Sequence, residues 1–366
     1  MRGRFRDPET LMSDASSPPP LQQAITALAD RQSLSEHLAA DVFGAVMRGE
    51  ATPAQTAALL IGLRIKGETA EEVAGAARAL RGAMVRVEID APYLVDTCGT
   101  GGGACTTFNI STAAAFVAAG AGATVAKHGN RSFTSRCGSA DVIEALGITI
   151  GLDAPAAARL LREARVVFLF APNFHPAMRH VGPVRRELGI TSVMNLLGPL
   201  ANPTGVRRQV IGVADRDRAP LMAQALARLG AEHAMVVHGR VGMDEISPLG
   251  VTDVWEIRDG RMSTWELDPA VHGGEPELAI SDGASLRGGD PAANAARLER
   301  ILAGDNGDPA GRAAVLLNAG AAIYVAGLAA TYRDGVGQAR AAVASGAARA
   351  ALERLRRASP NTVPTS

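Results

Sequence analysis

The sequence predicts an α/β protein in which a small all-helical N-terminal domain precedes a larger α/β domain with a mostly parallel central sheet. Capping signals and apolar residues at helical spacing fill residues 21–90. From residue 91 onward, short apolar strand patterns alternate with helical patterns, and glycine-rich loops follow the strands. A chain of 366 residues has room for two domains. We expect a disordered tail at 1–20, a helical domain at 21–90 with a returning segment at about 176–200, an α/β domain at 91–175 and 201–356, and a tail at 357–366.

The helical domain is predicted from residue spacing and from two capping boxes. The residues that recur every four positions, as in an amphipathic helix, are Leu34, Leu38, Val42 and Val46. Thr52-Pro53-Ala54-Gln55 offers an N-cap, a first-turn proline and a capping-box glutamine, and Thr69-Ala70-Glu71-Glu72 repeats the signature for the next helix. The apolar face between them should consist of Ala57, Leu60, Leu63 and Ile65. The domain should end near Arg81.

A central stretch, residues 95–147, combines short strands, glycine loops and a helix start. A strand ends at Val95, the loop 99–103 reads GTGGG, and an alanine-rich helix is expected from Ala113 to about Ala119. A strand, a glycine loop and a helix N-terminus together offer backbone N–H groups to a phosphate. Such turns are also common without a ligand, and this one does not match a Walker sequence. By itself the loop therefore indicates an anion site only weakly.

A second strand, 123–126, strengthens that interpretation because it runs into Lys127-His128-Gly129-Asn130-Arg131. Hydroxyl side chains follow at Ser132, Thr134, Ser135 and Ser139. Ligands of open α/β sheets bind beyond the carboxyl ends of the strands. The cations, the amide and the hydroxyls therefore predict a polyanion bound across the two loops, although Lys127 and Arg131 could instead be ordinary solvated charges.

The rest of the chain continues the alternation. The expected elements are a helix at 154–164, a buried strand at 166–170, a strand–helix–strand unit at 208–214, 219–229 and 234–238, a hairpin around 254–257 and 262–267, a buried helix around 316–324 and an amphipathic helix from 335 to 355. Proline and glycine are dense at 176–200, which indicates a hinge or domain crossing and not a regular element.

Several motifs resemble the anthranilate phosphoribosyltransferase family, which belongs to the nucleoside-phosphorylase-like phosphoribosyltransferases. The motifs are GTGG, TFNIST, KHGNR and GSAD in the central stretch, GEATPAQ and GLRIKGET before it, and PVRRELG, TSVMNLLGPLANP and HGxxGxDE after it. The similarity covers about residues 22–355. It implies transfer of a 5-phosphoribosyl group from phosphoribosyl pyrophosphate to the anthranilate amine in tryptophan biosynthesis, with about two Mg²⁺ ions per subunit. It also implies a homodimer formed through the helical domain.

The resemblance also implies site residues, position by position. Those matched to phosphoribosyl pyrophosphate are Gly99, Gly102, Gly103, Thr107, Asn109, Ile110, Ser111, Thr112, Lys127, His128, Gly129, Asn130, Arg131, Ser132, Phe133, Thr134, Ser135 and Ser139. Those matched to anthranilate are Gly99, Asn130 and Arg185, and those matched to Mg²⁺ are Ser111, Asp244 and Glu245. No nucleophile or general base is implied, and none is required, because an aromatic amine is already a free base at neutral pH.

Several assignments have alternatives at this stage. Asp244 and Glu245 could be a solvated turn, and Arg185 could be an ordinary surface charge. Ser139 could be the N-cap of a helix over 140–146. His128 and His175 either lie beside anthranilate or are hydrogen-bonded bystanders. Position 103 is a glycine where the family usually has an aspartate, so one possible metal partner is missing.

Composition and charge limit the function further. The 37 basic and 37 acidic side chains balance, and no basic stripe stands out, which disfavours nucleic-acid binding. No run of about 18 apolar residues predicts a membrane span. Cys98, Cys105 and Cys137 form no CxxC pair and suggest reduced thiols in the cytoplasm. The N-terminus lacks a secretory signal, and Met12 could be the true start. The alternatives are a pyrimidine nucleoside phosphorylase, which usually has a further C-terminal domain, and a non-catalytic relative that binds nucleic acid.

Overall fold

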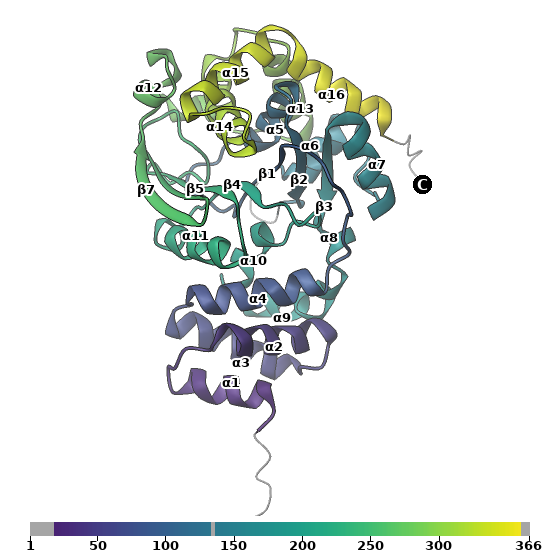
Figure 1. Cartoon of the computed structure of the whole chain (residues 1–366), viewed down its shortest axis with the longest axis vertical. Helices are drawn as coiled ribbons and strands as arrows, with labels where there is room; N and C mark the ends of the chain where they lie inside the picture. Colours follow the sequence, from purple (N-terminus) through teal and green to yellow (C-terminus); the bar gives the residue numbers. More distant parts are fainter. Residues whose placement is uncertain (1–17, 133–135, 360–366) are drawn as a thin grey trace, which may run out of the picture.

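The computed structural model describes residues 18–132 and 136–359 of the chain. At the N-terminal end, α1 (Pro20–Ala29), α2 (Glu36–Arg48), α3 (Pro53–Lys66) and α4 (Ala70–Gly82) pack into a bundle at the bottom of Figure 1. Both predicted capping boxes are present, at Thr52 and Gln55 and at Thr69 and Glu72. The prediction for the apolar face of α3 is wrong at one position, because the Ile65 side chain is 66% exposed near the end of the helix.

The larger domain contains a seven-stranded sheet in the order β3-β2-β1-β4-β5-β6-β7, within the described residues. The strands are β1 (Leu94–Gly99), β2 (Thr124–Gly129), β3 (Val166–Phe170), β4 (Arg208–Gly212), β5 (His233–Gly239), β6 (Thr252–Arg258) and β7 (Arg261–Leu267). The pairs from β3 to β5 are parallel, whereas β6 and β7 form the predicted antiparallel hairpin at one edge. The expected mostly parallel sheet is therefore confirmed.

Helices cover both faces of this sheet. The α-helices that follow the N-terminal bundle are α5 (Ile110–Gly120), α6 (Ser139–Ala145), α7 (Ala154–Ala164), α8 (Ala171–Phe174), α9 (Gly182–Leu188), α10 (Met194–Leu200), α11 (Ala219–Arg228), α12 (Pro269–His272), α13 (Pro291–Leu302), α14 (Pro309–Ala326), α15 (Tyr332–Ala344) and α16 (Ala347–Ala358). The 3₁₀ turns are η1 (Pro176–His180), η2 (Arg216–Arg218), η3 (Pro276–Leu278) and η4 (Gly283–Leu286). In Figure 1, α10 and α11 lie between the sheet and the N-terminal bundle, whereas α5, α14, α15 and α16 cover the opposite face.

The elements at the glycine loops are longer than the sequence suggests. β1 continues past Val95 to Gly99, because Thr97 and Gly99 still pair with Val210 and Gly212 of β4. β2 likewise continues through Lys127 to Gly129, alongside β3. α5 begins at Ile110, three residues before the expected start at Ala113. Pairing with a neighbouring strand decided the strand ends, and local propensity does not report it.

Two other expectations are wrong. The segment 176–200 is helical, in three short pieces (η1, α9 and α10). η1 and α9 each have a proline in the first turn, where it is tolerated. α10 follows a short break and has its proline, Pro199, near its end. The expected helix from 335 to 355 is two helices, α15 and α16, since Gly346 lies between them with φ +77°. At the C-terminus α16 extends to Ala358, slightly into the expected tail.

Two apolar clusters fill the interior. The first lies on the α5 and α14 side of the sheet and also includes much of α7 and α16. The second joins the N-terminal bundle to α10 and α11 and to the facing side chains of β4 and β5, such as Ile211 and Val236. The returning segment takes part in it through Val184 and Leu197. None of the helices in the described part of the chain is long and apolar enough to span a membrane.

Candidate active site at the carboxyl ends of the parallel strands

The loop after β1 lies against the loop after β5. Gly101 and Gly102 have φ of +68° and +78°, a region that favours glycine. The backbone N–H of Gly101 donates to Asp244 Oδ2 at 2.8 Å. A side chain at position 99 would place its Cβ 2.7 Å from the same oxygen, and one at position 103 would place it 2.8 Å from the Gly242 carbonyl oxygen. Glycine is therefore required here for the close approach of the two loops.

The N-terminus of α5 meets the same acidic loop. The backbone N–H of Ser111, in the first turn of α5, donates to Glu245 Oε1 at 3.2 Å. The Lys127 ammonium, from the end of β2, donates to Ser111 Oγ at 3.1 Å and to the Thr97 carbonyl oxygen at 2.5 Å. Residues from the ends of β1, β2 and β5 thus converge at one edge of the sheet, where the predicted ligand should lie.

Burial sets the electrostatics of these groups. Removal from water raises the pKa of Asp244, and burial together with repulsion from Asp244 raises the pKa of Glu245 to about 8. Burial lowers the pKa of Lys127, opposed by the attraction of the Asp96 carboxylate. The raised pKa values mean that nearby positive charges do not fully compensate the negative charge of these two neighbouring carboxylates. Their oxygens and Ser111 Oγ are the hard donors that Mg²⁺ takes, so the residues present fit the predicted metal.

Asp96 is a supporting residue that sequence reasoning missed. It is fully buried in β1, where its carboxylate accepts from the His128 backbone N–H at 3.2 Å and from Gln209 Nε2 at 3.4 Å. Burial raises its pKa, and hydrogen bonds and Lys127 partly oppose the rise. An acid inside an apolar strand was the available signal, because such a residue needs a buried partner. Asp96 positions β2 and balances part of the charge of Lys127.

Two residues of the loop after β2 make contacts that the sequence did not indicate. Ser139 is the first residue of α6 and not its N-cap, which is Gly138; Ser139 Oγ donates to the Asn130 carbonyl oxygen at 3.2 Å. Arg131 forms ion pairs of 2.7 Å with both Asp141 and Glu144, so its charge is already compensated. Phe133, Thr134 and Ser135 lie outside the described residues.

The remaining residues of the predicted phosphate set line α5 and the segment before it. Asn109 Oδ1 accepts from Asn294 Nδ2 at 3.0 Å, and its own amide donates to the Cys137 carbonyl oxygen, so this side chain links α5 to α13. The Thr112 hydroxyl is buried without a hydrogen-bond partner among the described residues. Ile110 is fully buried, so only its backbone could face a ligand. Thr107 lines a cavity described below.

The candidate anthranilate residues have unused polar groups. The Arg185 guanidinium on α9 is half-buried and has no ion pair or hydrogen bond within the described chain, and burial lowers its pKa. His128 and His175 are buried with their rings 5.0 Å apart. Within the described residues, neither nitrogen of His175, nor Nε2 of His128, makes a hydrogen bond of normal geometry, although the backbone of Gly198 lies close to His128 and that of Ala201 close to His175. Burial lowers the pKa of His128 to about 3 and that of His175 to about 4, so both rings are neutral at pH 7.

Comparison with known proteins shows to which family the chain belongs. The chain matches the family models of the glycosyl transferase family helical bundle domain over residues 22–84 and of its a/b domain over residues 91–349. It is 52% identical over 337 residues to an anthranilate phosphoribosyltransferase of Roseiflexus sp. (strain RS-1), covering 92% of this chain and 97% of that relative. It is 49% identical over 344 residues to the one of Anaeromyxobacter sp. (strain K), covering 94% and 99%.

Two solved structures are similar over nearly their whole length. The anthranilate phosphoribosyltransferase of Thermus thermophilus superimposes with a TM-score of 0.84 at 42% identity, covering 92% of this chain and 98% of that one. The enzyme of Saccharomyces cerevisiae in complex with phosphoribosyl pyrophosphate and Mg superimposes with a TM-score of 0.83 at 29% identity, covering 93% and 98%. With its fold and its converging loops, this chain belongs to the anthranilate phosphoribosyltransferase family of glycosyltransferases.

Proposed function

We propose that this chain catalyses the family reaction with the residues that converge at the ends of β1, β2 and β5. The supporting observation is the set of contacts that joins Gly101 to Asp244 and Ser111 to Glu245 and Lys127. The loop N–H groups, the α5 N-terminus and the Lys127 ammonium would bind the phosphates of phosphoribosyl pyrophosphate. The direct test is the loss of anthranilate fluorescence when phosphoribosyl pyrophosphate and Mg²⁺ are added to the purified protein.

The chemistry follows from positioning and electrostatics. The anthranilate nitrogen attacks C1 of the ribose, the new C–N bond replaces the C–O bond to pyrophosphate, and pyrophosphate leaves with that electron pair. The nitrogen then releases a proton to water. Lys127 and the α5 N-terminus stabilise the negative charge that develops on the leaving group. No side chain has to act as a nucleophile.

Magnesium belongs to the same proposal. Asp244, Glu245 and Ser111 would hold it, with about two ions per subunit as the resemblance implies. When bound, Mg²⁺ would supply charge neutralisation for the diphosphate. A yeast relative was solved with phosphoribosyl pyrophosphate and Mg, which supports the use of magnesium.

Arg185 would bind the anthranilate carboxylate, with Gly99 and Asn130 lining the same position. A half-buried guanidinium without an ion-pair partner in the described residues is suited to a planar carboxylate, which it can contact with two parallel hydrogen bonds. The neutral His128 and His175 rings would accept or donate hydrogen bonds close to the aromatic ring of anthranilate.

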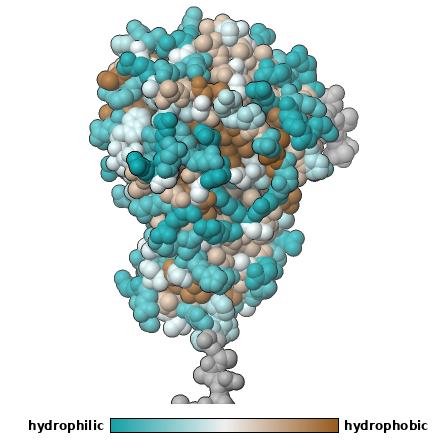
Figure 2. Space-filling view, viewed as in Figure 1, coloured by the Kyte–Doolittle hydropathy of each residue, from teal (hydrophilic) through white to brown (hydrophobic). Residues whose placement is uncertain are grey.

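We further infer a homodimer that forms through the helical bundle. Ile65 at the end of α3 is 66% exposed and Ile190, after α9, is 48% exposed. Figure 2 shows a hydrophobic patch on the surface of the bundle, low in the view. The sedimentation mass of the natural protein and of Ile65→Glu tests this inference: a dimer that becomes a monomer supports it, and a natural monomer contradicts it.

We assign the protein to the cytoplasm and to small-molecule substrates. Cys98 and Cys105 are free thiols, as expected in a reducing compartment. The zero formal net charge disfavours nucleic acid as a partner. Subcellular fractionation and a nucleic-acid binding assay at low salt would test these two assignments.

A further inference from the structure

Asn318 is a polar residue at the centre of an apolar helix. It lies in α14, in which every residue from Ala313 to Ala326 is buried, and it has the only carboxamide in that run. The residue itself is 3% exposed. An amide is an unfavourable choice for the interior of a buried helix, because it must find hydrogen-bond partners there. The partners of Asn318 therefore indicate its role.

Those partners include both backbone polar groups of Ile246. The Ile246 N–H donates to Asn318 Oδ1 at 2.9 Å, and Asn318 Nδ2 donates to the Ile246 carbonyl oxygen at 2.9 Å. Nδ2 also donates to the carbonyl oxygen of Ala314, one turn earlier in α14, at 2.9 Å. One buried side chain thus holds the backbone of a residue in a distant segment of the chain.

Ile246 directly follows the acid pair Asp244-Glu245. A peptide group is planar, so the hydrogen bond to the Ile246 N–H also fixes the carbonyl group of Glu245. The carbonyl group of Ile246 shares a plane with the Ser247 N–H, which donates to Thr252 Oγ1 at 3.0 Å. Both peptide groups next to Ile246 therefore have a fixed orientation, and with them the backbone from which the Glu245 side chain projects.

The other end of this acidic loop is held by the sheet. The Gly239 N–H donates to the Met243 carbonyl oxygen at 2.9 Å, and the Met243 N–H donates to the Gly239 carbonyl oxygen at 3.1 Å. A Cβ at position 212 would lie 1.6 Å from the Asp244 carbonyl oxygen, so the loop lies directly against the end of β4. The acid pair is thus placed between these contacts with the sheet and the hydrogen bonds to Asn318.

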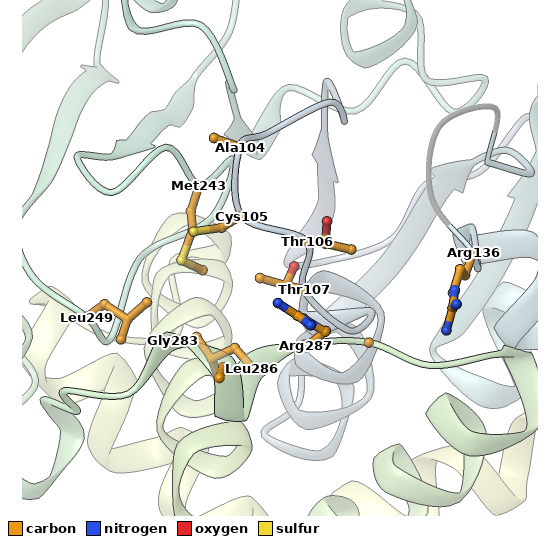
Figure 3. A pocket seen from close by; sticks show the side chains of 12 residues that line it. Ala104, Cys105, Thr106, Thr107, Arg136, Met243, Leu249, Gly283, Leu286 and Arg287 are labelled. Atoms are coloured by element: carbon orange, nitrogen blue, oxygen red, sulfur yellow. The ribbon is translucent and has the colours of Figure 1, made fainter.

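A further side of the acidic loop borders a cavity of about 590 Å³. Met243 and Leu249, which precede and follow the acid pair, line this cavity together with Thr107 and with Arg287 after η4. In Figure 3, Met243 and Leu249 lie on one side of the cavity and Arg136 on the far side. Packing is incomplete on this side of the loop, so its position depends on the contacts with the sheet and with α14.

We propose that Asn318 is a positioning residue for the metal site, because it orients Asp244 and Glu245 through the backbone of Ile246. The inference rests on the proposed function, which assigns these two carboxylates to Mg²⁺. Among the described residues, the hydrogen bonds of Asn318 all go to backbone atoms, so it acts through the loop and is not itself a ligand. Removal of a group that orients metal ligands commonly weakens metal affinity by about 10- to 100-fold.

The test compares Asn318→Ala and Asn318→Leu with Tyr332→Phe. Both Asn318 variants remove all three hydrogen bonds, and alanine and leucine both favour a helix. The Tyr332 hydroxyl donates to the Leu317 carbonyl oxygen at 3.1 Å. Its variant therefore removes a buried hydrogen bond to the preceding residue of α14 and leaves the acidic loop unchanged, which makes it a matched control.

Metal binding is measured apart from catalysis. The dissociation constant of Mn²⁺ in the presence of inorganic pyrophosphate is determined by electron paramagnetic resonance. The Mg²⁺ concentration at half-maximal activity, the anthranilate KM at saturating Mg²⁺ and the melting temperature are determined for the same proteins.

We expect both Asn318 variants to bind Mn²⁺ at least about tenfold more weakly than Tyr332→Phe, and to need more Mg²⁺ for half-maximal activity. The anthranilate KM should stay within about twofold of the control, because the loop would be loosened only at the metal. The melting temperature should fall for all three variants, since each loses a buried hydrogen bond. A change in metal affinity that is restricted to the Asn318 variants therefore separates positioning from stability.

Hydrogen–deuterium exchange of the natural protein tests the geometry without any variant. The Ile246 amide should exchange as slowly as the amides inside β5, because its acceptor is buried. In Asn318→Ala, exchange over residues 243–249 should be faster, whereas Tyr332→Phe should match the natural protein. Fast exchange of the Ile246 amide in the natural protein would overturn the proposal even if neither Asn318 variant folds.

The outcomes also distinguish this proposal from the function on which it rests. If the Asn318 variants bind Mn²⁺ within about twofold of an active Tyr332→Phe, Asn318 has a structural role only and the proposed function stands. If the natural protein and Tyr332→Phe are both inactive, the proposed function itself is contradicted.

Discussion

The carboxylate of Asp244 accepts a hydrogen bond from the backbone N–H of Gly101, with 2.8 Å between nitrogen and Oδ2. Glu245 does the same for the N–H of Ser111, at 3.2 Å. These N–H groups belong to the glycine loop and to the α5 N-terminus, the two places where a phosphate would bind. In this structure, the proposed metal ligands therefore accept hydrogen bonds from backbone N–H groups that a bound phosphate would otherwise use.

The double variant Asp244→Asn with Glu245→Gln should weaken activation by Mg²⁺ without unfolding the protein. The amides keep an oxygen for the Gly101 and Ser111 N–H groups but lose the charge that a divalent ion needs. Activity is measured against Mg²⁺ concentration, with melting temperature as the fold control and Glu163→Gln, an exposed acid on α7, as the charge control. Saturation at the wild-type Mg²⁺ concentration would remove the pair from the metal site.

Arg185→Ala should raise the anthranilate KM far more than the KM for phosphoribosyl pyrophosphate. The lost charge-assisted interaction is on the order of 1.5–3 kcal/mol. The adjacent Arg186 is exposed on the same helix, which makes Arg186→Ala a matched control. If both variants leave the anthranilate KM unchanged, Arg185 does not bind the carboxylate.

The glycine at position 103 should make the activity less steeply dependent on Mg²⁺ than in a relative with aspartate there. Any side chain at 103 would place its Cβ 2.8 Å from the Gly242 carbonyl oxygen, so Gly103→Asp also displaces the loop. Gly103→Ala creates the same contact without a carboxylate, and it isolates the metal effect from the steric one. Mg²⁺ titrations of the natural protein and both variants are compared; identical Asp and Ala curves would mean that a carboxylate at 103 does not tune the metal.

The neutral pair of His128 and His175 should make the free energy of unfolding fall as the pH decreases from about 6.5 toward about 4.5. Burial lowers the pKa of His128 to about 3 and of His175 to about 4, so in this window the unfolded chain binds protons that the folded chain does not. Each group contributes a slope of up to about 1.4 kcal/mol per pH unit.

Urea unfolding at several pH values measures this slope for the natural protein and for His128→Asn with His175→Asn. The variant removes both titrating groups, so its slope should be flatter even if it is less stable throughout. Equal slopes would show that the two rings do not account for the acid sensitivity.

The sequence predicted the architecture because the helical and strand patterns were strong. The hairpin, the strand at Val166–Phe170 and the helix at Ala154–Ala164 have the predicted places, since each is an apolar pattern bounded by clear breaks. Within the site, the sequence pointed to the loops and to the acid pair, and the structure brings Ser111, Lys127 and Glu245 together.

Contacts between distant segments could not be read from local patterns. The extension of β1 to Gly99 depends on pairing with β4, and the neutralisation of Arg131 depends on Asp141 and Glu144 one helix away. The cavity beside Arg287 likewise exists only because η4 packs against the end of the glycine loop. No spacing rule connects residues that lie so far apart in the chain.

The second apolar cluster has a consequence for how the protein can move. Leu60 of α3 and Leu80 of α4 share one packed interior with Met222 of α11 and Ile211 of β4. A wide rotation of the bundle away from the sheet would expose these side chains to water. The free-energy cost is about 25 cal/mol for each Å² of apolar surface exposed. Closure over a substrate is therefore restricted to small sliding of packed helices, and heat should melt the bundle and the adjoining half of the sheet in a single cooperative step.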